Sequence, residues 1–311
     1  MSRGRARSTR GGGATLPDLS RYGSLAEYNR KRHFGVTPEP PGRRPGAAAG
    51  PRPLAFVVQK HRATRLHYDF RLEHRGVMLS WAVPKGPSLD PAVKRLAMET
   101  EPHPMDYNQF EGVIPEGEYG AGTVMIWDRG AWAPVADGRL GDETDVDRQL
   151  ARGELKFVML GEKLAGSWTL VRTRGERQWL LIKHRDEHAT TEDVAATRPR
   201  SVVSDRTMAA IARAAGATPR QLEQAAATDP APAGSSKRAS TAPSEPPLRR
   251  PRAEAALERR LLGHAPGRRG KPRPGPPRSP TSGAPRRGAG APAPTPPAAA
   301  PASRARRRRS S

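Results

Sequence analysis

The chain contains no cysteine, so disulfide bonds and cysteine-ligated zinc or iron–sulfur sites are excluded. It also lacks any apolar run near the ~20 residues that a membrane-spanning helix needs. The basic N-terminus, residues 1–13, is not followed by the apolar segment of a secretory signal, so we expect a cytoplasmic protein. Aromatic residues make up only 5% of the 311 residues, and none follows Trp179. The sequence beyond that point has little with which to build a core.

Acidic residues are scarce towards both ends of the chain. Residues 51–190 carry 20 Lys/Arg and 20 Asp/Glu, whereas residues 1–50 have a net charge of +7 and residues 191–311 a net charge of +16. Segments that are basic, rich in proline and poor in aromatics cannot offset the entropy lost on folding. We therefore expect four parts: a disordered basic arm over 1–23, one globular domain over 24–190, a linker with short helices over 191–228, and a disordered Pro/Ala/Arg-rich tail over 229–311.

The middle of the chain alternates apolar and polar residues with a period of two, which is the pattern of β-strands. Eight short strands with few helical stretches between them favour an antiparallel barrel over a sandwich, because closure removes exposed edges. The sequence thus predicts a mainly β fold, a compact antiparallel β-barrel of about eight strands with short peripheral helices. The candidate strands are 54–60, 66–73, 76–83, 94–101, 122–128, 154–160, 166–174 and 178–184.

Three regions carry helix signals. A run from Ser24 to Glu27 fits a capping box and predicts a helix from about Leu25 to Arg32. Residues 145–152 predict one or two turns that stop at a glycine. Residues 204–228 predict two short alanine-rich helices, the second of which begins at Thr218-Pro219.

The densest polar cluster in the sequence runs from Gln59 to Arg71. Residues two apart on a strand share a face, so His67, Asp69 and Arg71 are expected to point one way and the apolar residues between them the other. His61, His67 and Asp69 together form a candidate three-ligand metal site with open positions, and Arg71 lies next to it, where it can bind an anion. The alternative is a polar strand face with hydrogen-bonded histidines and no metal.

Other metal chemistries fit the sequence less well. Zinc proteases carry His-Glu-x-x-His on a helix, which is absent. Iron oxygenases also use two histidines and a carboxylate, but their His-x-Asp pair is followed by a distant third ligand, whereas here His61 precedes the pair. The Lys-x-Asp-Gly motif of nucleotidyltransferases is absent too, so ligation by this chain is not supported.

Three further stretches are informative only in combination. Lys85 lies on a stiff turn between prolines and a glycine. The alternative is that this segment is a surface turn without a functional role. His103 is held between two prolines with Tyr107 four residues later, and could be an incidental loop histidine. The glycine-rich stretch 114–122 lacks the Gly-Lys-Ser/Thr ending of a phosphate-binding loop, so it does not indicate a nucleotide site.

Taken together, these motifs resemble the 3′-phosphoesterase domain of bacterial DNA ligase D. The resemblance rests on residues 56–72, 80–89, 103–107 and 110–122, which occur in the expected order, and it covers about residues 25–190. It implies a β-barrel that trims DNA 3′ ends during non-homologous end joining, first removing a 3′-terminal ribonucleoside and then the 3′-phosphate. The ligase and polymerase modules of the multidomain protein have no counterpart in this sequence.

The resemblance also implies a cofactor, partners and site residues. The cofactor is a divalent metal, typically Mn²⁺, and the partners are DNA 3′ ends together with Ku and a separately encoded ligase or polymerase. We expect a nucleoid-associated monomer that does not bind membranes. The implied site residues are His61, His67 and Asp69 as metal ligands, Arg71, His103 and Tyr107 as catalytic residues, and Lys85, Arg95, Arg32, Glu39, Gln59 and Glu101 as phosphate-binding or supporting residues.

One position departs from the pattern of the family. Where an Arg-Asp-Phe run is expected, this chain has Arg32-His33-Phe34, so a carboxylate is missing. The missing carboxylate is expected to affect the positioning of a water molecule and the activity, and not the three metal ligands. It supports a second hypothesis, a catalytically weak or inactive module that binds DNA or serves as a scaffold in end joining.

Overall fold

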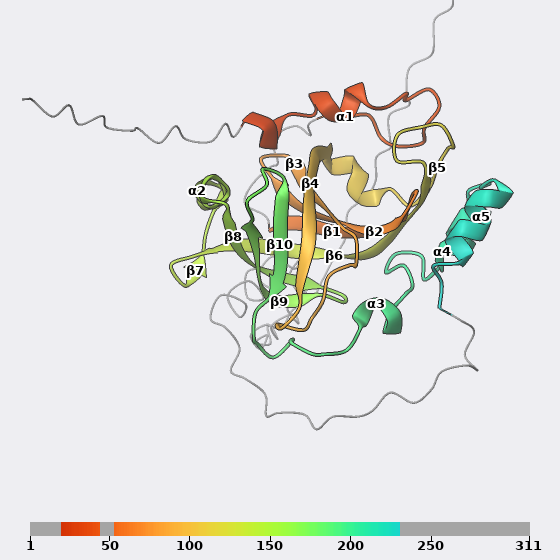
Figure 1. Cartoon of the computed structure of the whole chain (residues 1–311). Helices are drawn as coiled ribbons and strands as arrows, with labels where there is room; N and C mark the ends of the chain where they lie inside the picture. Colours follow the sequence, from red (N-terminus) through yellow and green to blue (C-terminus); the bar gives the residue numbers. More distant parts are fainter. Residues whose placement is uncertain (1–19, 44–52, 231–311) are drawn as a thin grey trace, which may run out of the picture. The chain divides into compact units, whose positions relative to one another are not determined.

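Eight antiparallel strands close into a barrel in the computed structural model, which describes residues 20–43 and 53–230 (Figure 1). The predicted barrel of about eight strands is confirmed, and all eight predicted strands are present. The strand predicted over 122–128 is longer than expected and continues to Ala136, because Gly130 pairs on both sides instead of ending it. In order around the barrel the strands are β1 (Leu54–Arg62), β2 (Leu66–His74), β3 (Val77–Val83), β4 (Lys94–Pro104), β10 (Gln178–Lys183), β9 (Ala165–Arg172), β8 (Glu154–Gly161) and β6 (Gly122–Ala136), and β6 pairs with β1 to complete the ring.

Two short strands, β5 (Gly112–Ile114) and β7 (Arg139–Leu140), were not expected from the sequence, and both pair with β6. They are three and two residues long, too short for alternation to reveal them. The expected disorder of the basic arm over 1–19 and of the tail over 231–311 lies outside the described residues.

The barrel is filled by the apolar side chains that alternate along its strands. Phe56 and Val58 of β1 and Tyr68 and Phe70 of β2 belong to one core cluster. All five tryptophans of the chain are fully buried: Trp81, Trp127, Trp132, Trp168 and Trp179. Because side chains alternate across a strand, the polar residues between these positions, such as Asp69, face away from the barrel core.

Two residues form the turn of the hairpin between β2 and β3. Arg75 has φ of 47° and Gly76 has φ of 74°, the pair of positive angles that a type I′ turn requires. Arg75 is stabilised in this conformation by its ion pair with Asp147 on helix α2 (Glu143–Arg152). This turn fixes the register of β2 with β3, and the turn over 63–65 joins β1 to β2 in the register that brings polar side chains together on the outer face.

The predicted helices are present, with one correction to their caps. Helix α1 (Ala26–Arg30) begins without the expected capping box: its N-cap is Leu25, and the Ser24 Oγ only accepts the Ala26 N–H at 3.3 Å. Helix α2 begins slightly earlier than expected, because Asp142 and Asp145 form a capping box, and it ends at Gly153 with φ of 75°. The 3₁₀ turns are η1 (Ser20–Gly23) and η2 (Met105–Gln109), and the C-terminal helices are α3 (Val194–Thr197), α4 (Met208–Ala214) and α5 (Pro219–Ala226).

Helices α4 and α5 pack onto the barrel. Met208 and Ile211 of α4 and Ala225 of α5 belong to the main core cluster. Polar contacts add to this: the Lys60 Nζ donates to the Thr228 carbonyl at 2.7 Å. Residues 191–230 are therefore joined to the barrel by apolar and polar contacts. No helix among the described residues is long and apolar enough to cross a membrane.

Candidate metal centre and phosphate pocket

Two histidines and one aspartate meet on the outer face of strands β1 and β2. His61 on β1 is the register partner of His67 on β2, and Gln59 is the partner of Asp69. The side chains of Tyr68 and the other core residues point into the barrel, so His67 and Asp69 point out of it. The sequence prediction that these residues share one polar face is confirmed.

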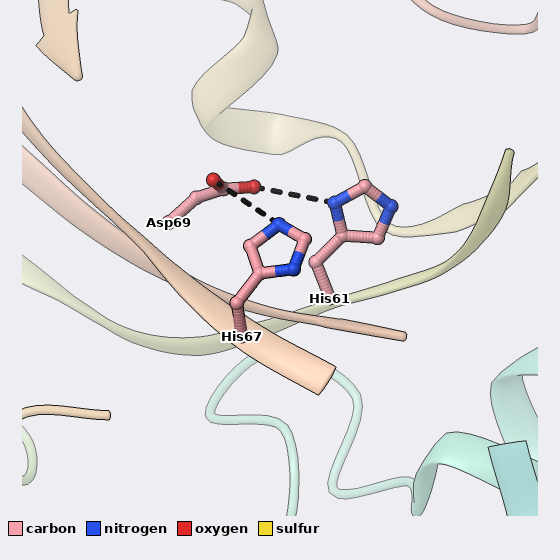
Figure 2. Close-up of side chains that lie close together, drawn as sticks. All are labelled: His61, His67 and Asp69. Atoms are coloured by element: carbon pink, nitrogen blue, oxygen red, sulfur yellow. Dashed lines mark ion pairs between the residues drawn. The ribbon is translucent and has the colours of Figure 1, made fainter. Parts of the chain in front are cut away.

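The three side chains converge on one point (Figure 2). His61 Nδ1 lies 3.4 Å from Asp69 Oδ2, and His67 Nε2 lies 3.6 Å from Asp69 Oδ1. One ligand atom from each residue can be chosen so that all three lie within 4.8 Å of one another, and no other such cluster occurs in the described ranges 20–43 and 53–230. This spacing suits three ligands of one metal ion.

Hydrogen bonds to carbonyl groups fix the ring orientation of both histidines. His61 Nε2 donates to the Gly120 carbonyl at 2.9 Å, and His67 Nδ1 donates to the Arg65 carbonyl at 3.0 Å. With these bonds in place, each ring would offer the lone pair of its other nitrogen, which faces Asp69, to a bound ion. Metal-ligating histidines characteristically donate their other N–H in this way, so the residues present fit a metal ion.

The charges of the cluster also fit a metal site. Burial opposes the ionisation of Asp69, but the charge of the neighbouring Arg71 guanidinium outweighs it and holds the pKa of this carboxyl well below its usual range. Burial lowers the pKa of His67, which keeps its imidazole neutral at pH 7. A carboxylate and a neutral imidazole are the protonation states that bind a cation.

Arg71 occupies the wall of the pocket beside the cluster and is almost fully buried. Its Nε donates to Gln59 Oε1 at 3.0 Å and its Nη1 to Ser80 Oγ at 2.7 Å, while Nη2 lies 3.1 Å from Asp69 Oδ2. Gln59 is held in turn, because its Nε2 donates to two carbonyl groups. These contacts fix a positive charge next to the candidate metal ligands, where a phosphate can bind.

His103 and Tyr107 form the adjoining wall, with ring centroids 4.8 Å apart in an edge-on arrangement. His103 Nδ1 donates to the Glu101 carbonyl at 2.9 Å, and Arg32 Nη2 donates to His103 Nε2 at 3.2 Å. Burial, followed by the charges of Arg71 and Arg32, lowers the pKa of His103 well below its usual value, so the ring is neutral. Burial raises the pKa of Tyr107, so its hydroxyl keeps its proton.

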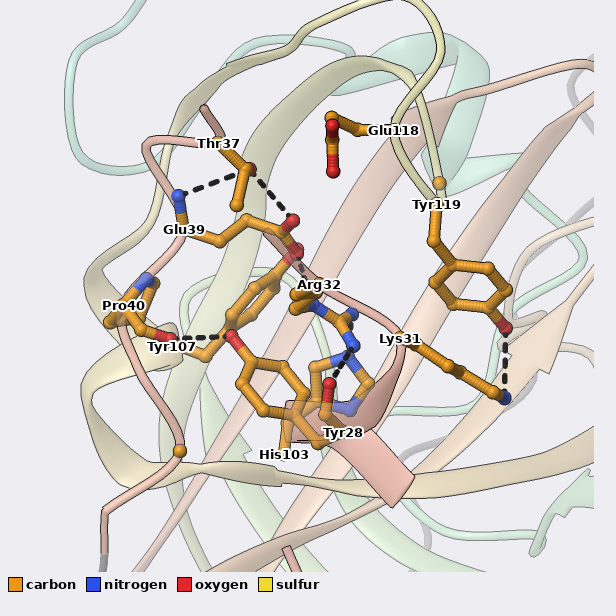
Figure 3. Close-up of polar contacts among 12 residues, drawn as sticks. Tyr28, Lys31, Arg32, Thr37, Glu39, Pro40, His103, Tyr107, Glu118 and Tyr119 are labelled. Carbon is orange, nitrogen blue, oxygen red and sulfur yellow. Dashed lines mark hydrogen bonds and ion pairs between the residues drawn. The ribbon is translucent and has the colours of Figure 1, made fainter. Parts of the chain in front are cut away.

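The N-terminal segment closes one side of the pocket (Figure 3). Arg32 reaches in from this segment: its Nε donates to Glu39 Oε1 at 2.8 Å and its Nη1 lies 3.4 Å from Glu101 Oε1. Its guanidinium also lies 3.7 Å from the ring centroid of Tyr28. Arg32, Glu39 and Glu101 therefore support one another, and Arg32 links this group to His103.

The structure adds residues that sequence reasoning missed. Lys31 bridges Glu101 and Tyr119, and Glu118 pairs at 3.1 Å with His33, whose side chain is 80% exposed. Tyr119 and Glu118 lie in the stretch 114–122, which the sequence marks out without a role. Lys31 carries no signal of its own, because its partners are 70 and 88 positions away.

Most of the expected site residues line one pocket of about 290 Å³. Gln59 and Glu39 lie behind this wall, against Arg71 and Arg32. Lys85 and Arg95 are not brought to the pocket: Lys85 is exposed just beyond β3, and Arg95 pairs with Leu181 towards the other end of β4. The expected residues in the lining are Arg32, His61, His67, Asp69, Arg71, Glu101, His103 and Tyr107.

Comparisons with known proteins cover the part of the chain that contains this pocket. Residues 59–172 match the family model of the DNA ligase D 3′-phosphoesterase domain. The chain is 55% identical over 190 residues to the multifunctional non-homologous end joining protein LigD of Pseudomonas aeruginosa, covering 59% of this chain and 22% of that protein. It is 43% identical over 164 residues to the protein of the same name from Mycobacterium bovis, covering 52% and 20%.

The chain spans about a fifth of the length of these relatives. The matched region begins within β1, contains the candidate metal-binding cluster, Arg71 and His103, and ends at the last residue of β9. Residues 59–172, which make up most of the barrel, therefore belong to the DNA ligase D 3′-phosphoesterase domain family.

Proposed function

We propose that this protein is a metal-dependent phosphoesterase that removes 3′-terminal ribonucleosides and 3′-phosphates from DNA in bacterial non-homologous end joining. The observation that carries the proposal is the pocket, in which the cluster of His61, His67 and Asp69 lies beside Arg71. The family of residues 59–172 and the end-joining names of the relatives support it. The activities of those longer proteins as wholes are not part of the proposal.

The donor set suits a divalent metal ion, for which we propose Mn²⁺. Imidazole and carboxylate ligands both accept first-row divalent ions, and two neutral imidazoles with one carboxylate leave a net charge of about +1. His61, His67 and Asp69 would hold the ion, which when bound polarises a phosphoryl oxygen and lowers the pKa of a water molecule.

The residues around the cluster would bind and orient the phosphate. The contacts of Arg71 with Gln59, Ser80 and Asp69 hold its guanidinium in one orientation, and its remaining N–H groups can donate to phosphate oxygens. The lone pair of His103 Nε2 accepts from Arg32 Nη2, because Nδ1 carries the proton, and it would become available to the substrate when Arg32 turns to the phosphate. It can accept a proton there and return it to the leaving oxygen.

DNA 3′ ends, at primer–templates or duplex ends, are the proposed substrates, and Ku with a separately encoded ligase or polymerase the proposed partners. Support for DNA comes from the charge of the flanks, +7 over residues 1–50 and +16 over residues 191–311, which favours binding to phosphates without reading sequence. We propose that the protein acts as a monomer in the nucleoid.

The proposal is tested on two oligonucleotides, one ending in a 3′-phosphate and one a primer–template with a single terminal ribonucleotide. We expect the full chain to release phosphate from the first and a nucleoside, followed by phosphate, from the second. Both reactions should require Mn²⁺ and stop when the ion is chelated. Absence of product from both substrates with Mn²⁺ present contradicts the proposal.

His103→Ala is expected to retain the metal and lose turnover. His103 contacts Arg32, Glu101 and Ser80 but neither of the two histidine ligands. Loss of a group that transfers a proton at the reacting phosphate should lower kcat on the order of 100-fold or more. Mn²⁺ binding by calorimetry and single-turnover rates measure the two effects, with His184→Ala, outside the pocket lining, as the matched control. Loss of metal from His103→Ala would show that it belongs to the metal site.

A second candidate function is a DNA-binding or scaffolding module with little or no activity. The observation that favours it is His33, whose exposed ring pairs with Glu118 where the family pattern has a carboxylate. Under this alternative the protein binds 3′-ended DNA but releases no phosphate, and His33→Asp raises the rate. If the wild-type protein is active and His33→Asp leaves its rate unchanged, position 33 does not limit turnover.

A further inference from the structure

Tyr119 places an exposed aromatic ring in the pocket that holds the metal ligands. It lines this pocket together with His61 and His67 and is 48% exposed. Four large apolar side chains are exposed in the described ranges, and Tyr119 is the aromatic one among them. An open aromatic face beside a phosphate-sized anion site is a surface on which a nucleobase can stack.

The loop that carries Tyr119 is fixed in place. The Ala121 N–H donates to the Glu118 carbonyl at 3.0 Å, and Gly120 has φ of 78°, the pattern of a type II turn with Tyr119 at its first corner. The Gly120 carbonyl accepts the hydrogen bond from His61 Nε2 at 2.9 Å. The position of the ring is thereby linked to a metal ligand through the neighbouring residue.

Two cations of the N-terminal segment hold the ring itself (Figure 3). Lys31 Nζ donates to the Tyr119 hydroxyl at 3.3 Å and lies 4.6 Å from the ring centroid, and the Arg32 guanidinium lies 5.5 Å from it. Lys31 is held in turn by Glu27 and Glu101. A ring restrained in this way loses little conformational freedom when a base stacks on it, which favours binding.

We propose that Tyr119 is the stacking surface for the base of the 3′-terminal nucleoside, the group that is released when the diester is cleaved. This inference rests on the proposed function. The phosphate is expected at His61, His67 and Arg71, and a nucleoside attached to it must extend towards the mouth of a pocket of only about 290 Å³. Every base has a π-face, so the contact accepts any terminal base. A 3′-phosphate end has no such nucleoside, so Tyr119 acts on one of the two proposed substrates only.

The test compares the full-length wild type and Tyr119→Ala on three ends: a terminal ribonucleoside, the same end with an abasic ribose, and a 3′-phosphate. We expect Tyr119→Ala to lower kcat/KM on the first end by about 5- to 150-fold, the range given by stacking of one base. The wild type should show a similar loss on the abasic end, and the two changes together should cost no more than either alone. Both proteins should act equally on the 3′-phosphate.

Two further variants separate stacking from a loss of structure. Tyr119→Phe keeps the ring and should keep the preference for a base over an abasic ribose. Val203→Ala shortens a side chain that is also 48% exposed but does not line the pocket, and it should behave as wild type on all three ends. Thermal unfolding of Tyr119→Ala checks that the loop remains folded.

The outcomes distinguish this inference from the proposed function. If the wild type is active but Tyr119→Ala loses as much on the abasic end as on the intact one, stacking is wrong and the proposed function stands. If the wild type is inactive on all three ends, the proposed function fails. Stacking is then read from binding, using an end with a terminal 2-aminopurine whose fluorescence the wild type should quench and Tyr119→Ala should not. Equal quenching by both proteins would overturn the inference.

Discussion

His67→Ala should remove bound Mn²⁺ and lower turnover on the order of 1,000-fold without unfolding the domain. The size of the effect follows from the several kcal/mol that a metal ion contributes at a reacting phosphate, at a factor of ten for each ~1.4 kcal/mol. His67 is the suitable ligand to change, because its side chain is 22% exposed and its second nitrogen bonds only the nearby Arg65 carbonyl. Removal of Asp69 would instead leave Arg71 as a buried charge without its carboxylate partner.

Calorimetric titration with Mn²⁺ and single-turnover assays on a 3′-phosphate end measure the effect, and thermal unfolding confirms the fold. His184→Ala serves as the control, because it removes an imidazole that does not line the pocket. If His67→Ala keeps both the ion and its activity, the metal centre has been assigned to the wrong residues.

The sequence revealed the barrel and the centre of the site because both depend on short-range patterns. His61, His67 and Asp69 lie within nine residues of each other, on two strands of one hairpin, so alternation alone places them on one face. The eight barrel strands could be predicted for the same reason. Their closure into a ring could only be inferred from the general preference for hidden edges.

The outer parts of the site could not be predicted in this way. Lys31, Glu101 and Tyr119 come from three separate segments, and nothing in their local sequence indicates that they meet. At Ser24 the pattern of a capping box was present, but the helix starts without it. Arg95 was assigned to the site by resemblance, and the structure places it far along β4 from His103.

The amino-acid composition of the C-terminal region and its contacts suggest different ends for the folded domain. Judged by its lack of aromatics, the chain after residue 190 should be dispensable for folding. The structure argues against a cut at 190, because Met208 and Ile211 are buried in the main core and the Trp127 Nε1 donates to the Arg198 carbonyl at 2.9 Å. Helix α5 also reaches the site loops, where Gln221 Nε2 donates to the Ile114 carbonyl at 2.9 Å.

A protein that ends at residue 190 should therefore be strongly destabilised. The cut removes Met208 and Ile211, and losing the burial of two such side chains against the barrel costs ~1.5–3 kcal/mol each. It also takes the carbonyl acceptors from the Trp127 N–H and the Lys60 Nζ, at ~1–3 kcal/mol each. The sum is comparable to the ~5–15 kcal/mol that stabilises a typical domain. Urea unfolding of the two truncated proteins, ending at 190 and at 230, measures the difference, and equal stability would contradict it.

A protein that ends at residue 230 tests how the charge of residues 231–311 contributes to DNA binding. It keeps every residue that the structure describes, yet it removes 19 basic and 3 acidic residues, a net charge of +16, whereas residues 191–230 are neutral overall. We therefore expect unchanged turnover on a short 3′-phosphate end and weaker DNA binding, most clearly at low salt. Each phosphate contact contributes about −0.9 to the slope of log K against log salt on duplex DNA, so loss of even three contacts should make the slope shallower by about 2.7. Titration of full-length and 1–230 proteins onto one duplex at several salt concentrations gives the two slopes. Equal slopes would mean that residues 231–311 do not bind DNA and that the folded part alone recognises the 3′ end.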